Sequence, residues 1–88
     1  MNYSFYSPKK PSFGHKIVKT IAVLSERGSY RTILGVVQFG NAPAKFDIRT
    51  WQTDSDGVET ACKGKSLSID EMRNLQDALK DYEIPDTI

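Results

Sequence analysis

The chain of 88 residues, 39% hydrophobic and 26% charged with a formal net charge of +1, makes one small domain. The core of such a domain is marginal unless a disulfide, a metal or a partner subunit stabilises it. The single cysteine and single histidine exclude an internal disulfide and a four-ligand zinc site, so we expect stabilisation by oligomerisation, without cofactor or metal. With no run of eighteen apolar residues, no secretion signal and one free thiol, we expect a cytoplasmic protein that does not bind membranes.

The chain opens with a segment, residues 1–16, that has neither the period of two of a strand nor the 3.6 of a helix. We expect a flexible N-terminal tail there. Residues 17–25 are apolar and β-branched, which predicts a strand, and residues 30–39 predict a second one. The short connection between them contains glycine, so the two strands form a hairpin.

A third strand is predicted for residues 45–51, whose side chains alternate in polarity, and a fourth for residues 62–67. The sequence Asp-Ser-Asp-Gly at residues 54–57 is typical of a turn. All connections are too short for the crossovers that parallel strands need. The sequence therefore predicts a four-stranded antiparallel β-meander.

A C-terminal helix is predicted after Ser68, which can cap it, with Glu71 three residues later completing a capping box. An apolar stripe follows at helical spacing and consists of Met72, Leu75, Ala78, Leu79 and Tyr82. Pro85 prevents the helix from continuing. The fold class is α+β, with the domain at 17–83, a short tail at 84–88, and the helix expected to cover one face of the sheet.

The third strand carries the strongest functional signal. Its alternation places one set of side chains under the helix (Phe46, Ile48, Thr50) and the other on the uncovered face (Lys45, Asp47, Arg49, Trp51). Proteins that bind single strands combine cations that follow the backbone with aromatic planes that stack on bases, worth about 1–3 kcal/mol per base. The competing interpretation is a solvated face on which Trp51 completes the core, and alternation alone does not decide between them.

Further cations lie on the neighbouring strands. Lys63 and Lys65 flank Gly64, which allows close backbone approach, and Arg31 lies beside the first hairpin. Tyr30 can either stack on a base or pack into the core.

No catalytic pattern is present. Asp54, Asp56 and Gly57 resemble part of a calcium loop, but the bidentate acid is missing, so a turn is the better interpretation. Cys62 has no base near it in the sequence, which favours a half-buried strand thiol. We expect neither an enzyme nor a small-molecule substrate.

Charge is strongly segregated along the chain. Residues 1–53 carry eight Lys or Arg and two acids, whereas residues 54–88 carry four Lys or Arg and nine acids. Such a chain can present a local anion-binding surface that its net charge conceals. Chance segregation between sheet and helix is the alternative.

Two segments carry a family resemblance: Phe-Asp-Ile-Arg-Thr-Trp at residues 46–51, and Lys-Gly-Lys-Ser-Leu-Ser at 63–68 before the acidic helix start. Over residues 17–82 the chain resembles the positive cofactor four (PC4-type) transcriptional coactivators, particularly their bacterial YdbC-like branch. The resemblance implies a homodimer that binds single-stranded DNA across its sheets with little sequence preference. It implies that Arg49 and Lys63 contact phosphate and that Trp51 lies at the base-stacking surface, with Lys45 and Arg31 as additions. Lys65 departs from the apolar residue usual there and is a further candidate contact.

The sequence therefore predicts a DNA-binding protein for single strands, active in transcription regulation, replication or repair. Two alternatives stay open. One is a protein-interaction or coactivator module that recruits partners through its acidic helical side, and the other is a binder that prefers RNA, because stacking and phosphate contacts do not exclude a 2′-hydroxyl.

Overall fold

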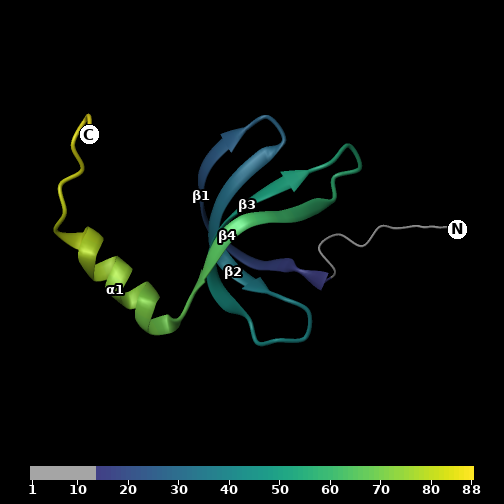
Figure 1. Cartoon of the computed structure of the whole chain (residues 1–88), viewed down its shortest axis with the longest axis horizontal. Helices are drawn as coiled ribbons and strands as arrows, with labels where there is room; N and C mark the ends of the chain where they lie inside the picture. The colour runs from purple at the N-terminus through teal and green to yellow at the C-terminus, as the bar shows by residue number, and fades with distance from the viewer. Residues whose placement is uncertain (1–13) are drawn as a thin grey trace, which may run out of the picture.

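The computed structural model describes residues 14–88 and shows four antiparallel strands followed by one helix (Figure 1). The sheet has the order β1-β2-β3-β4, so each strand pairs with its neighbour in sequence and the predicted meander is confirmed. The elements are β1 (Lys16–Arg27), β2 (Tyr30–Gln38), β3 (Lys45–Thr53), β4 (Glu59–Leu67) and α1 (Ile69–Lys80). Of the predicted tail, residues 1–13 lie outside the described residues, and Lys16 already belongs to β1.

The third and fourth strands extend further toward their shared turn than predicted. Thr53 pairs with Glu59 and Gln52 with Thr60, so β4 begins three residues before the predicted Cys62. The turn itself is closed by Asp54, whose carboxylate oxygen Oδ1 accepts the backbone N–H groups of Asp56 and Val58, each at 2.9 Å. The carboxylate thus satisfies turn donors that lack a strand partner, as Asp does in such turns.

Strand β1 is an edge strand interrupted by three irregularities. Its register against β2 shifts at Val18, Ile21 and Leu24, each of which is an extra residue without an opposing partner. Bulges of this kind bend a strand and increase its twist, which accounts for the strongly curled sheet (Figure 1). They also interrupt the hydrogen-bonding edge, which makes edge-to-edge pairing with another sheet unfavourable.

The core lies on the face of the sheet that carries the odd-numbered residues of β2 and β3. Ile33, Val37 and Trp51 are buried there, and Ile17, Phe39 and Ala61 pack against them. We expected the other face, with Phe46 and Ile48, to form the core under the helix. That prediction is wrong: Phe46 and Ile48 are only half-buried. The curled sheet instead encloses its own opposite face.

Helix α1 begins where it was predicted to begin, but it covers less of the sheet than predicted. Ser68 Oγ accepts the Glu71 N–H at 3.0 Å, and the Glu71 carboxylate accepts the Ser68 N–H at 2.9 Å, which completes the capping box. None of its residues is buried, and it projects away from the sheet (Figure 1). Only Ser68 separates α1 from β4, so the end of the strand dictates where the helix starts.

An open groove separates the apolar stripe of α1 from the sheet. Met72, Leu75 and Leu79 line it on the helix, and Ile21 and Leu34 line it on β1 and β2. Its volume is about 690 Å³. The expected cover of one sheet face by the helix is therefore incomplete in the single chain.

Gly64 allows β4 to lie directly against β3. A Cβ atom at this position would lie 2.5 Å from both the Arg49 Cβ and the Ile48 carbonyl oxygen, closer than any real contact. We therefore expect Gly64→Ala to lower the free energy of unfolding by about 1–3 kcal/mol, the usual cost of overpacking. Thr60→Ala, at an exposed position of the same strand, is the matched control in urea denaturation. Equal midpoints for Gly64→Ala and wild type would contradict the close approach.

Candidate nucleic-acid interface

Trp51 is part of the core. Only 1% of its surface is exposed, and in the sheet register it lies between Arg31 on β2 and Ala61 on β4. Its indole Nε1 finds no acceptor among the described residues. The prediction that Trp51 lies on an open base-stacking surface is wrong, and the competing interpretation, that it completes the core, is confirmed. The physical reason is that the curled sheet closes over this face.

Arg49 is engaged inside the sheet. Its Nε and Nη2 donate to the two carboxylate oxygens of Asp47 at 2.9 and 3.0 Å, and its Nη1 donates to the Cys62 carbonyl at 2.9 Å. The guanidinium carbon lies 5.1 Å from the centre of the Phe39 ring, within cation–π range. Only 16% of the Arg49 side chain is exposed, so it does not lie on the open surface that we predicted.

Asp47 is the acceptor at the centre of this arrangement. Its side chain is completely buried, and besides Arg49 it accepts the Ser66 hydroxyl at 3.1 Å. A buried carboxylate is stable only when it is paired and hydrogen-bonded, and three donors meet this requirement. Asp47 thus orients Arg49.

Arg31 is also paired. It forms an ion pair with Glu59 of β4, and the pair spans β3 beside Trp51. About a third of each side chain is exposed, so this pair lies at the rim of the core. Arg31 therefore contributes to closing the core and has less charge to offer a ligand than its position in the sequence indicated.

The three predicted lysines remain available. Lys45, Lys63 and Lys65 are exposed, and within residues 14–88 none of them forms an ion pair. Lys63 lies where β4 gains an extra residue: Arg49 pairs with Gly64, but Trp51 pairs with Ala61. Cys62 is half-buried, as expected of a strand thiol. The structure thus separates the six predicted site residues into the largely buried Trp51 and Arg49, the ion-paired Arg31 at the rim of the core, and three exposed lysines.

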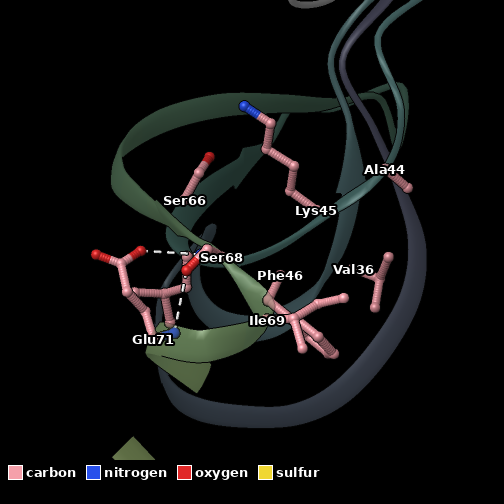
Figure 2. A pocket seen from close by; sticks show the side chains of 9 residues that line it. Val36, Ala44, Lys45, Phe46, Ser66, Ser68, Ile69 and Glu71 are labelled. Atoms are coloured by element: carbon pink, nitrogen blue, oxygen red, sulfur yellow. Dashed lines mark hydrogen bonds between the residues drawn. The ribbon is translucent and has the colours of Figure 1, made fainter. Parts of the chain in front are cut away.

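Lys45 stands at a cleft that the sequence did not reveal. The cleft, about 440 Å³ in volume, lies between the start of β3, the end of β4 and the first turn of α1. Figure 2 shows Val36, Phe46 and Ile69 grouped on one side, with Lys45 and Ser66 pointing to another. Only the juxtaposition of the Ser68 cap with β3 creates it, and no local sequence signal marks such a contact.

The cleft is also lined by Glu71, whose carboxylate is committed to the capping box (Figure 2). The Ser68 backbone N–H lowers the pKa of Glu71 below its usual value, and the positive charge of Lys65 acts in the same direction. Glu71 is therefore ionised at neutral pH and held by the helix start. Among residues 14–88 the ammonium group of Lys45 therefore forms no ion pair, although a carboxylate lines the same cleft.

Comparison of the chain with protein-family models, curated proteins and solved structures finds no match. The family resemblance therefore stays a prediction from the sequence. Of what it implies, the four-strand and one-helix topology is what the structure shows. Within residues 14–88, no helix has the length and hydropathy to cross a membrane.

The buried ion pair leads to a prediction about stability. Arg49→Ala leaves the buried Asp47 carboxylate without its cation, so we expect the free energy of unfolding to fall by about 3 kcal/mol. Lys65→Ala removes an exposed cation from the neighbouring strand and should change the free energy of unfolding by less than about 0.5 kcal/mol. Chemical denaturation of both variants measures the difference. Equal stability of the two would show that the pair does not hold the core.

Proposed function

We propose that the protein binds single-stranded nucleic acid, DNA above all, through its phosphates and with little sequence preference. The observation that carries this proposal is a set of exposed cations on the strands that make no ion pair among the described residues: Lys16, Lys19, Arg27, Lys45, Lys63 and Lys65. Acidic residues gather instead on α1 and the residues after it. A sheet whose exposed cations are unpaired, with the acids gathered elsewhere, attracts a polyanion even when the net charge is near zero.

The burial of Trp51 changes the kind of binding that is proposed. Without an exposed indole, most of the affinity comes from the release of counterions when lysines neutralise phosphates. Such binding depends steeply on salt and tolerates any base. The cleft beside Lys45 has an apolar wall, formed by Phe46 and Ile69 among others. We propose that the base of a bound nucleotide packs against this wall. A protein with such binding would act on nucleic acid that is transiently single-stranded.

A homodimer is part of the proposal. In the single chain, Leu79 is 55% exposed, and Val18, Ile21 and Leu24 of the bulged edge strand are exposed as well. So many large apolar side chains on 75 described residues indicate a surface that another protein covers. A second copy meets this need because a domain of 88 residues gains the missing core from its own dimer. The open groove between α1 and the sheet also favours the alternative function, a module that recruits other proteins through its helix.

Salt titration of oligo-dT binding tests the nucleic-acid proposal. If Lys45, Lys63 and Lys65 of each subunit neutralise roughly six phosphates per dimer, the log–log slope of affinity against salt should be about −4. Lys63→Ala should flatten it by about 1.4, because two contacts of about 0.7 each are lost. Arg73→Ala is the control and should leave the slope unchanged, because Arg73 is exposed on α1, already pairs with Asp70 and does not line the groove. A wild-type affinity that does not depend on salt would overturn the proposal. Affinities for duplex DNA and RNA of the same length, measured beside oligo-dT, show which kind of nucleic acid the protein prefers.

Sedimentation equilibrium tests the homodimer. Leu79→Asp places a charge in the groove, so we expect it to shift a wild-type dimer to monomer, because burying an unpaired carboxylate is unfavourable. Ile84→Asp is the matched control, since Ile84 is highly exposed and does not line the groove. A wild-type protein that sediments as a monomer would instead support the interaction-module alternative.

A further inference from the structure

One ion pair on β3 holds both ends of the lysine segment of β4. The segment Lys63–Lys65 is flanked by Cys62, whose carbonyl accepts Arg49 Nη1 at 2.9 Å, and by Ser66, whose hydroxyl donates to Asp47 at 3.1 Å. Arg49 and Asp47 are themselves joined by two hydrogen bonds of 2.9 and 3.0 Å. Two neighbouring side chains of one strand therefore fix the residues immediately before and after the segment.

The middle of the segment is held as well. Gly64 pairs with Arg49 in the register of the sheet, and its Cα lies so close to β3 that no Cβ fits. Next to this contact β4 contains its extra residue, where regular strand pairing is interrupted. Arg49 supplies a donor to the Cys62 carbonyl at this interruption. The backbone that carries Lys63 is thus anchored where a bulge would otherwise leave it loose.

We propose that Arg49 and Asp47 are positioning residues that present Lys63 and Lys65 to phosphate in one fixed arrangement. The inference rests on the proposed nucleic-acid binding and assigns Arg49 a different role from direct phosphate contact. If residues 63–65 are already ordered before the nucleic acid binds, less conformational entropy is lost on binding. The buried pair therefore acts on affinity through the backbone of β4.

Arginine is required for this geometry. Its planar guanidinium donates at the same time to both oxygens of Asp47 and to the Cys62 carbonyl. A lysine ammonium is a single compact charge on a flexible stem and cannot hold both partners in this planar arrangement. Arg49→Lys therefore keeps the charge next to Asp47 and removes the link to Cys62, which separates positioning from charge.

The test is a double-mutant cycle between Arg49→Lys and Lys63→Ala, measured as oligo-dT affinity over a range of salt. Arg49→Lys should lower the affinity of the dimer roughly 25-fold, because one newly mobile side chain in each subunit represents about fivefold, and should leave the salt slope unchanged. Lys63→Ala should flatten the slope by about 1.4 per dimer. In the Arg49→Lys background, Lys63→Ala should cost less affinity than in the wild type, because a loosely held lysine contributes less.

Two controls separate positioning from general loss of stability. Ile33→Val weakens the same core by removing one buried methyl group and should leave oligo-dT affinity unchanged. Amide hydrogen exchange without nucleic acid should be faster in Arg49→Lys at residues 62–66 and unchanged in α1.

The outcomes that would overturn the inference are distinct. A salt slope that Arg49→Lys flattens as much as Lys63→Ala would make Arg49 a direct phosphate contact. Wild-type affinity in Arg49→Lys, or unchanged exchange at residues 62–66, would show that the pair does not position the segment. Absence of salt-dependent binding by the wild type would instead overturn the proposed function, and the exchange experiment would still decide whether the pair holds the segment.

Discussion

The buried carboxylate of Asp47 is the constraint on which the sheet depends. A completely buried charge is tolerated only with a partner and a full set of hydrogen bonds, and Asp47 receives them from Arg49 two residues along the same strand and from Ser66 on the next. Because alternate residues of a strand share a face, the Asp-Ile-Arg order places carboxylate and guanidinium side by side. Arg49 extends the network to the Cys62 carbonyl, so one buried carboxylate, through its partners, links β3 to β4 on both sides of Gly64.

The curl of β1 determines which face becomes the core and which is left open. Three extra residues bend the edge strand, and the bent sheet encloses Ile33, Val37 and Trp51 on its odd-numbered face. The opposite face receives only the start of α1, which leaves the groove beside Leu79 uncovered. A core that forms without the helix explains how the helix can be apolar along one stripe and still contain no buried residue.

The sequence was sufficient to predict the strands, the turns and the helix start, but not which face of the sheet is buried. Alternation in residues 45–51, glycine in the turns and the Ser68–Glu71 capping box are local signals, and the strands, turns and helix start follow them. Alternation correctly separated Trp51 and Arg49 from Phe46, which lies near the helix, but it does not say which of the two faces is buried, so the face of Trp51 and Arg49 was wrongly expected to be open. The bulges at Val18, Ile21 and Leu24 depend on pairing between strands, and the cleft at Lys45 depends on contact between β3 and the helix start. Neither has a local signal.

With the indole and the guanidinium buried, the proposed binding of nucleic acid depends on lysines. A lysine is a flexible, strongly hydrated point charge, and holding it in place removes rotamer freedom that a rigid aromatic ring does not lose. An interface built on lysines therefore gains more from an ordered backbone than one built on stacking. In the proposed interface, the Asp-Ile-Arg segment, predicted from the sequence as the contact surface, instead supports the strand that carries the exposed lysines of β4.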